Sequence, residues 1–218
     1  DFDTAPRDAE PPTARCLIFV TPDGERTMNT FLGASQYLPP AALDDELIAS
    51  AGILYLEGYL WDPEEPRSAM RHAIDVARKA GRKVAFTASE SFVIDRHGDD
   101  FRALIDGGMI DILFANEVEL GALTGETDFD AGVDALKDKV PTLVVTRSEK
   151  GAVCVTGGET YKVAAEPIEK VVDTTGAGDA FTAGLLHRWT AAPVERIRFA
   201  AACGALVCAG AGGIDPQP

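Results

Sequence analysis

The sequence predicts an α/β fold in which a mostly parallel sheet carries helices on both faces. Short runs rich in β-branched and apolar residues alternate with amphipathic segments of helical period along most of the 218 residues. Alternation of this kind is typical of βαβ units, whose right-handed crossovers build parallel sheets. A hairpin pattern early in the chain and a glycine-rich turn before a late helix complete the prediction.

The first predicted element is a β-hairpin over residues 14–32. Residues 16–20 have the composition of a strand, and residues 27–32 predict the strand that returns. Between them, Thr-Pro-Asp-Gly at 21–24 combines residue types that favour turns. Residues 1–12 are rich in Asp, Glu and Pro, and we expect them to form an exposed entry segment.

Helical and extended patterns then follow each other in a regular order. Asn116, Arg147 and Asp179 each come after a predicted strand, so we expect them at one rim of the sheet, where ligands bind in such folds. Helices are expected at 41–51, 63–81, part of 91–106, after Asn116, at 129–138, from Ala180 to Trp189 and at 194–208. Strands are expected at 53–56, 83–87, 111–115 and 142–146, with an antiparallel pair at 152–156 and 160–163.

The composition limits the classes of function. The formal charge of −15, with no basic stripe, argues against a nucleic-acid partner but allows a small phosphate-bearing ligand. The apolar runs are too short or too rich in Ala and Gly to span a bilayer, and no signal peptide is visible. We therefore expect a cytoplasmic protein with no membrane partner. The four cysteines sit singly in apolar surroundings and are expected to be reduced core thiols.

The prediction of function depends on residues 171–181. Their glycines arrive at the start of a helix, where unpaired N–H groups and the helix dipole favour an anion. Asp179 adds a carboxylate there, although a capped glycine-rich turn would explain the same pattern. A dinucleotide fingerprint fails because Phe181 stands at its third glycine, and no Gly-Lys-Ser/Thr follows as in a Walker loop.

Three motifs resemble those of one known family. Asp-Thr-Thr-Gly-Ala-Gly-Asp at 173–179 resembles the signature of the ribokinase-like (PfkB-type) carbohydrate and nucleoside kinases. Asn-Glu-Val-Glu at 116–119 resembles the Asn-x-x-Glu motif of this family, and residues 146–151 resemble the segment that lines its nucleotide site. Residues 25–30 and 56–62 look most like bacterial members labelled adenosine kinase.

The resemblance implies how the chain is organised. Residues 14–32 would be part of a β lid, and residues 33–218 would be the α/β nucleotide-binding and catalytic domain. Family chains carry an additional N-terminal third, with the first sheet strands and a Gly-Gly substrate motif. Because this sequence begins about where the lid hairpin should be, we expect that N-terminal part of the fold to be absent. An exposed lid could pair with a second lid and form a homodimer.

The resemblance also implies a reaction, in which a hydroxyl of the acceptor attacks the γ-phosphorus of ATP. Asp179 would contact the acceptor and take the hydroxyl proton as general base. The N–H groups of Gly176, Ala177 and Gly178 would stabilise charge on the transferred phosphoryl group. The alternative for Asp179 is a helix N-terminal charge that only supports the fold.

The ligands of the cofactors are implied by the same family. Asn116 would lie near the phosphates, and Glu119 would organise water around Mg²⁺, although a capping box alone would explain both residues. A monovalent cation, usually K⁺, would be bound by Asp173 and Thr175 with carbonyls from residues 209–213. The nucleotide would be contacted by Thr146, Ser148, Lys150 and Gly151, with Arg147 near its phosphates.

On the acceptor side, the resemblance points to Glu57 at the end of a predicted strand and to Asn29 on the lid, with Arg26 near it. An ordinary solvated glutamate is the alternative for Glu57. His72, His97 and His187 are scattered along the chain and are not expected to be catalytic. The run Asp-Arg-His at 95–97 is likewise not expected to form a catalytic triad.

Several hypotheses for the whole chain therefore remain open. The first is an ATP-dependent kinase that acts on a nucleoside, most similar to adenosine kinases. The second, within the same class, is a ribokinase- or fructokinase-like sugar kinase. The third is an inactive nucleotide-binding fragment, because much of the acceptor pocket would lie in the N-terminal third. A dinucleotide-dependent oxidoreductase is disfavoured by Phe181.

Overall fold

The computed structural model describes residues 10–211. The chain divides into two compact units. The first unit comprises the residues up to 15 together with 30–143, and the second comprises 16–29 together with 144 onward. The tip of the hairpin thus belongs to the same unit as the C-terminal part of the chain.

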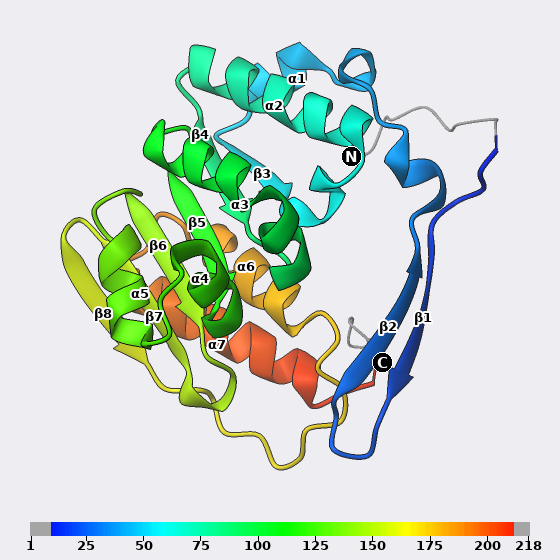
Figure 1. The fold of residues 1–218 in the computed structure, drawn as a ribbon. Helices are drawn as coiled ribbons and strands as arrows, with labels where there is room; N and C mark the ends of the chain where they lie inside the picture. Colours follow the sequence, from blue (N-terminus) through cyan, green and yellow to red (C-terminus); the bar gives the residue numbers. More distant parts are fainter. Residues whose placement is uncertain (1–9, 212–218) are drawn as a thin grey trace. The chain divides into compact units, whose positions relative to one another are not determined.

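The strands form one sheet of two strands and one of six (Figure 1). In the smaller sheet β1 (Arg15–Val20) pairs with β2 (Arg26–Phe31), which confirms the predicted hairpin. The strand order in the larger sheet is β3-β4-β5-β6-β7-β8. These strands are β3 (Ile53–Glu57), β4 (Lys83–Thr87), β5 (Ile112–Asn116), β6 (Thr142–Thr146), β7 (Ala152–Thr156) and β8 (Glu159–Val163).

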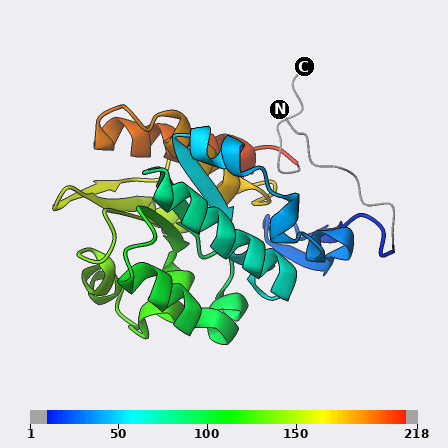
Figure 2. The ribbon, with the colours of Figure 1, turned by 90° about the horizontal axis from the view of Figure 1, so that it is seen from above.

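The first unit has the parallel βαβ arrangement that the sequence predicts. β3 pairs with β4 and β4 pairs with β5, both in parallel. Because crossovers between parallel neighbours are right-handed, α2 and α3 lie on the same side of β3 (Figure 2). The helices of this unit are α1 (Asp45–Ser50), α2 (Glu64–Lys79), α3 (Ser91–Asp106), α4 (Glu117–Thr124) and α5 (Phe129–Leu136), with short 3₁₀ turns η1 (Gly33–Gln36), η2 (Pro40–Ala42) and η3 (Gly58–Trp61).

Aromatic rings form the centre of the core in the first unit. Trp61 is fully buried, and its ring meets those of Phe86 and Phe101 edge-on, at centroid distances of 5.8 and 5.3 Å. Phe86 and Phe101 also contact each other edge-on at 5.0 Å. Edge-to-face pairs of this kind are favourable beyond the apolar area that they bury. The core therefore joins η3, β4 and α3, the elements that border the carboxyl end of β3.

The second unit combines an antiparallel strand pair with two packed helices. β7 and β8 pair from Ala152 with Val163 to Thr156 with Glu159. α6 (Ala177–His187) and α7 (Pro193–Cys208) lie side by side (Figure 1), and α7 also contacts both strands. A β-carbon at Gly184 would lie 2.9 Å from the Cys203 sulfur, so glycine there permits the close approach of the two helices. The short 3₁₀ turn η4 (Ser148–Lys150) connects β6 to β7.

Several predicted elements differ in their limits. The helix expected at 41–51 is a 3₁₀ turn followed by α1, because the Asp44 side chain caps the helix at the N–H of Leu47. α3 is interrupted at His97, which has φ −125° and ψ 17°. α6 ends at His187, so Trp189 lies outside it, and residues 164–176 contain no strand before Asp179. The segment before the glycine-rich turn is thus a loop, and the nearest strand before it is β8, which ends at Val163.

Of the four cysteines, which were all predicted to be core thiols, only Cys154 is fully buried. Cys154 is buried on β7, whereas Cys203 and Cys208 are partly exposed on α7. Cys16 is exposed, because both strands of the hairpin are exposed along their whole length. Among the residues that the structure describes, no helix is both long and apolar enough to cross a membrane.

Candidate active site

The loop that leads into α6 has a defined turn. The Asp173 side chain is 6% exposed, and its Oδ1 accepts the backbone N–H of Thr175 at 2.8 Å. Gly176, the N-cap of α6, has φ +77°, a left-handed value that favours glycine. The Gly176 carbonyl then accepts the N–H of Ala180 at 2.8 Å and begins the helix. The glycine in the motif is thus needed for the turn itself.

Asp179 lies in the first turn of α6 and is exposed. An acidic side chain at this position complements the helix dipole, and its exposure leaves the carboxylate open to a small molecule. Around Gly178 there is open space, since a β-carbon there would have no neighbour within 4 Å. The N–H of Ala177, one of the predicted donors, is directed at the Thr174 carbonyl at 3.3 Å. It would have to turn away from Thr174 to meet a phosphoryl oxygen.

Two oxygen groups in the same loop suit a hard cation. The Thr175 hydroxyl oxygen is buried and has no hydrogen-bond partner among the described residues. A buried polar atom of this kind is uncommon and calls for an explanation such as an ion or a water molecule. The carboxylate of Asp173, two residues away, is buried as well. Hydroxyl, carboxylate and carbonyl oxygens are the ligands that hard cations prefer.

The segment after β6 makes a tight loop. Arg147 donates its backbone N–H to the Gly151 carbonyl at 2.8 Å, and Ser148 has φ +50°. Gly151 has φ +88° and ψ −139°, a conformation that is essentially restricted to glycine. A β-carbon at Gly151 would also collide with the Val163 carbonyl on β8. Thr146 is partly buried, whereas Ser148 and Lys150 are exposed on this loop.

Asn116 and Glu119 form a complete capping box at the start of α4. Glu119 is 6% exposed, and burial raises the pKa of its carboxyl group to about 7. The hydrogen bond from the Asn116 N–H opposes this shift, whereas the negative charge of Glu90 adds to it. Both carboxylate oxygens of Glu119 accept hydrogen bonds from Asn116, so the side chain is held in one orientation.

Glu57 lies at the end of β3, and its Oε1 accepts the hydroxyl proton of Tyr55 at 3.2 Å. The next residue, Gly58, is buried and donates its N–H to the Ser89 hydroxyl at 2.8 Å. A β-carbon at Gly58 would lie 2.8 Å from the Ala88 carbonyl. Ser89 has φ +67°, which is unusual for a residue other than glycine and typical of constrained sites. The sequence contained no signal for this contact.

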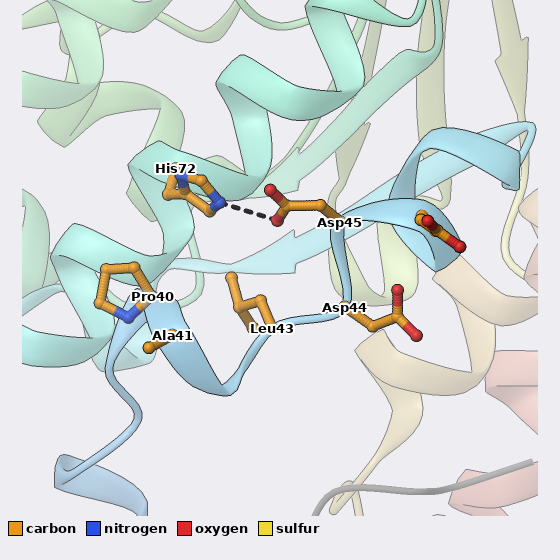
Figure 3. A pocket seen from close by; sticks show the side chains of 7 residues that line it. Pro40, Ala41, Leu43, Asp44, Asp45 and His72 are labelled. Atoms are coloured by element: carbon orange, nitrogen blue, oxygen red, sulfur yellow. Dashed lines mark hydrogen bonds and ion pairs between the residues drawn. The ribbon is translucent and has the colours of Figure 1, made fainter.

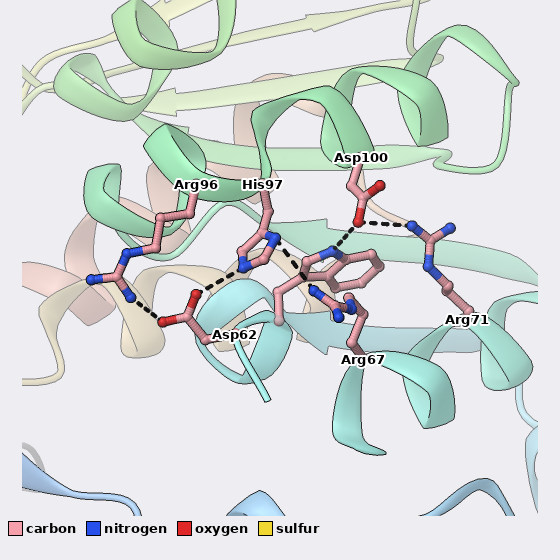
Figure 4. Close-up of polar contacts among 7 residues, drawn as sticks. Asp62, Arg67, Arg71, Arg96, His97 and Asp100 are labelled. Carbon is pink, nitrogen blue, oxygen red and sulfur yellow. Dashed lines mark hydrogen bonds and ion pairs between the residues drawn. The ribbon is translucent and has the colours of Figure 1, made fainter. Parts of the chain in front are cut away.

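Two linked polar groups anchor the segment that follows Glu57 (Figure 4). His97 donates from Nε2 to Asp62 at 2.8 Å, while its Nδ1 faces the Arg67 guanidinium at 3.4 Å. A guanidinium only donates, so both contacts are satisfied by the tautomer with its proton on Nε2. Arg96 also pairs with Asp62. His97 thus has a structural partner that is distant in sequence, rather than the neighbouring Asp95.

The second group of this network surrounds Trp61. The indole N–H of Trp61 donates to Asp100 at 2.9 Å, and Asp100 pairs with Arg71 at 2.8 Å. The Arg71 guanidinium lies over the indole ring, 5.3 Å from its centroid. These contacts, together with those of Asp62, fix η3 against α2 and α3. The backbone just after Glu57 is therefore rigidly supported.

A cavity of about 540 Å³ in the first unit contains none of the predicted site residues (Figure 3). The Asp45 carboxylate and His72 Nε2 meet at its side, 2.8 Å apart. Asp44 faces it but already caps α1 through the N–H of Leu47. We assign this cavity no part in the chemistry, because it is wide open and both Asp44 and Asp45 have local partners.

The predicted site residues fall into two groups. Glu57, Asn116 and Glu119 belong to the first unit, at the carboxyl ends of β3 and β5. Asn29, on exposed strand β2, belongs to the second unit together with the α6 loop and the segment after β6. Convergence of the two groups on one reaction centre stays a prediction. The second group comprises Asn29, Thr146, Ser148, Lys150, Gly151, Asp173, Thr175, Gly176, Ala177, Gly178 and Asp179.

Known structures with the same fold include bacterial kinases. An adenosine kinase from Sinorhizobium meliloti is 41% identical, with a TM-score of 0.94 over 99% of this chain and 67% of its own. A probable sugar kinase from Rhizobium etli CFN 42 is 39% identical, with a TM-score of 0.95 over 99% of this chain and 66% of its own. A double-mutant fructokinase from Vibrio cholerae O395, bound to fructose, ADP and potassium ion, is 27% identical, with a TM-score of 0.77 over 93% of this chain and 70% of its own.

Curated relatives include fructokinases. Fructokinase-1 of Oryza sativa subsp. japonica is 31% identical over 97% of this chain and 70% of its own length. The chain spans about two thirds of the length of the proteins that it matches. The model of the pfkB family of carbohydrate kinases matches residues 1–218. The resemblance seen in the sequence and the predicted enzyme class are confirmed: the chain belongs to the pfkB family of carbohydrate kinases, phosphotransferases that act on a hydroxyl group of a sugar or nucleoside.

Proposed function

We propose that this chain transfers the γ-phosphoryl group of ATP to a hydroxyl of a nucleoside, with adenosine as the first candidate. The observation that carries the proposal is the start of α6, where exposed Asp179 follows the turn at Gly176. The proposed base, Asp179, therefore lies within one helical turn of the proposed N–H donors at residues 176–178. The 41% identity with an adenosine kinase, against 31% with rice fructokinase-1, supports a nucleoside as acceptor.

In this proposal Asp179 accepts the proton of the attacking hydroxyl. The N–H groups of Gly176, Ala177 and Gly178 stabilise the charge on the phosphoryl oxygens, helped by the dipole of α6. Ala177 contributes once its N–H leaves the Thr174 carbonyl. The left-handed turn at Gly176 fixes the backbone that presents the N–H groups of Gly176 and Gly178, so among the three donors only Ala177 has to reorient.

ATP would be bound with Mg²⁺, which neutralises phosphate charge when it is present. Glu119 is already held by two hydrogen bonds from Asn116, so it fits a role in orienting water around the metal rather than direct ligation. The exposed loop after β6 supports nucleotide contacts by Ser148 and Lys150, while Thr146 and Gly151 shape that loop.

A monovalent cation would lie beside the α6 loop. The buried Thr175 hydroxyl without a partner among the described residues, and the buried Asp173 carboxylate, support this site. The potassium ion bound by the similar fructokinase from Vibrio cholerae gives it further support. A cation here would stabilise the turn from which Gly176 and Asp179 project.

The acceptor would be contacted by Glu57 and Asn29. Glu57 lies on a backbone that Gly58 and Ser89 hold in place, which supports a positioned side chain. Asn29 lies on the exposed hairpin, which fits a lid. The same hairpin exposes Leu17 and Phe19 by 64% and 62%, which supports the pairing of two lids in a homodimer.

A sugar kinase is the second candidate, supported by the identity with fructokinases and with a probable sugar kinase. A panel of acceptors decides between the two. The chain is incubated with ATP, Mg²⁺ and adenosine, other nucleosides, ribose or fructose, and kcat/KM is measured for each. We expect adenosine to give the highest value. A higher value for ribose or fructose supports the second candidate. ATP binding without turnover for any acceptor supports an inactive nucleotide-binding piece.

A further inference from the structure

We propose that Arg26 on the hairpin is a positioning residue for the loop that carries the reaction centre, acting through Thr174. This inference rests on the proposed function, in which that loop presents Asp179 and the N–H donors. It changes the expected role of Arg26, from a residue over the acceptor to one that holds the loop. The hairpin would thereby determine whether the loop is ordered for phosphoryl transfer.

The contact between hairpin and loop consists of three hydrogen bonds that converge on Thr174. Arg26 donates to the Thr174 hydroxyl at 2.7 Å. That hydroxyl donates to the Gly24 carbonyl at 3.2 Å, and the Thr174 backbone N–H reaches the same carbonyl at 3.3 Å. A hydroxyl that both accepts and donates in this way is held in one orientation. Hydrogen bonds that involve a charged group are also the stronger ones.

Close packing supports the same contact. Gly24 is buried although it lies in the hairpin turn, and it has φ +83°. A β-carbon at this position would lie 2.5 Å from a methyl carbon of Val171. The turn itself is braced, since the Asp23 carboxylate accepts both the Thr21 hydroxyl and the N–H of Glu25. The tip of the hairpin is therefore held by its own hydrogen bonds and lies in direct contact with the loop.

Thr174 passes this constraint to the start of α6. It lies two residues before Gly176, the N-cap of α6, and its neighbours are fixed by the bond from the Thr175 N–H to the Asp173 carboxylate. On the other side, Val172 donates its N–H to the Cys208 carbonyl at the end of α7, at 2.9 Å. The loop is thus held between α7 and the hairpin. Loss of the hairpin contact leaves only one of these two supports.

The first test does not depend on activity. Amide hydrogen exchange is measured for peptides that cover residues 171–178 in the wild type, Arg26→Ala and Arg15→Ala, the last being a matched change on the same hairpin. We expect about tenfold faster exchange in Arg26→Ala alone. Exchange in α7 should stay unchanged, which excludes general loss of stability. Unchanged exchange at 171–178, or equal acceleration in α7, would overturn the proposal.

The second test uses the phosphoryl transfer itself. We expect Arg26→Ala and Thr174→Val each to lower kcat by about tenfold with little change in KM, and the double variant to be no worse than either single one. Arg26→Lys and Thr174→Ser, which keep a donor and a hydroxyl, should recover part of the rate. A change confined to the KM of the acceptor, or additive losses, would overturn the proposal. An inactive wild type would reject the proposed function while leaving the exchange test valid.

Discussion

Asn116 and Glu119 are joined by three hydrogen bonds at the start of α4. The Asn116 backbone N–H donates to Glu119 Oε2 at 3.0 Å, its side-chain amide donates to Oε1 at 2.7 Å, and its own Oδ1 accepts the Glu119 N–H at 2.8 Å. The same pair is thus a helix cap and a carboxylate with a raised pKa. A structural role and a functional one are compatible here, because the hydrogen bonds orient the side chain that would organise water around the metal.

The stability of the protein without ligands should fall as the pH rises from about 4.5 to about 7. In the folded state the Glu119 carboxyl group has a pKa of about 7, whereas its ordinary pKa is 4.5. Between these two pH values the folded state holds a proton that the unfolded state has lost, so a rise in pH favours unfolding. The loss amounts to roughly 3 kcal/mol and is complete above the folded-state pKa. Urea unfolding at several pH values should show this slope for the wild type and for Glu126→Gln, but not for Glu119→Gln.

Replacing Asp179 by Asn should lower kcat by about 10²- to 10⁴-fold, since it removes the proton acceptor while keeping the shape of the side chain. The affinity for ATP should change little. Glu195→Gln is the matched control, because Glu195 occupies the first turn of α7 as Asp179 does in α6. Equal turnover by Asp179→Asn and the wild type would show that the carboxylate only supports the helix.

Gly151→Ala should destabilise the second unit and weaken nucleotide binding. The new β-carbon would collide with the Val163 carbonyl as well as strain the backbone. Gly158→Ala is the control, because Gly158 also has a positive φ, +79°, but has no atom within 4 Å of the added carbon. We expect Gly158→Ala to cost about 1 kcal/mol and Gly151→Ala clearly more. Thermal unfolding measures the effect on stability, and titration with ATP measures the effect on binding. An equal loss of stability in the two variants would show that the contact with the Val163 carbonyl has no effect.

Trp61→Ala should lower the free energy of unfolding by about 3–5 kcal/mol, because it leaves a cavity between Phe86 and Phe101. Trp61→Phe should cost less, since it keeps a ring but leaves Asp100 without the indole donor. Tyr59→Ala in the same 3₁₀ turn is the control, because Tyr59 is 43% exposed. Chemical unfolding monitored by circular dichroism should rank the three variants in that order.

The order of elements could be predicted because its signals are local. Apolar periodicity placed β3, β4, β5 and the hairpin to within a residue or two, and Asp128 and Asn116 cap helices where their residue types favour it. Local reasoning failed where tertiary contacts decide. Val171 and Val172 have the β-branched side chains that are typical of strands, yet both lie in a loop, where Val171 lies next to the hairpin turn and Val172 bonds to the end of α7.

The sequence by itself determined the family, the α/β class and the residues of the glycine-rich loop, because motifs and periodicity are properties of neighbouring residues. Only the tertiary structure decided which distant residues hold those motifs in place. The bond from Arg26 to Thr174 joins residues 148 positions apart, and Asp62 meets His97 across 35 positions. Contacts of this kind depend on how helices, strands and loops pack against one another. The separation of two residues in the sequence does not predict such a contact.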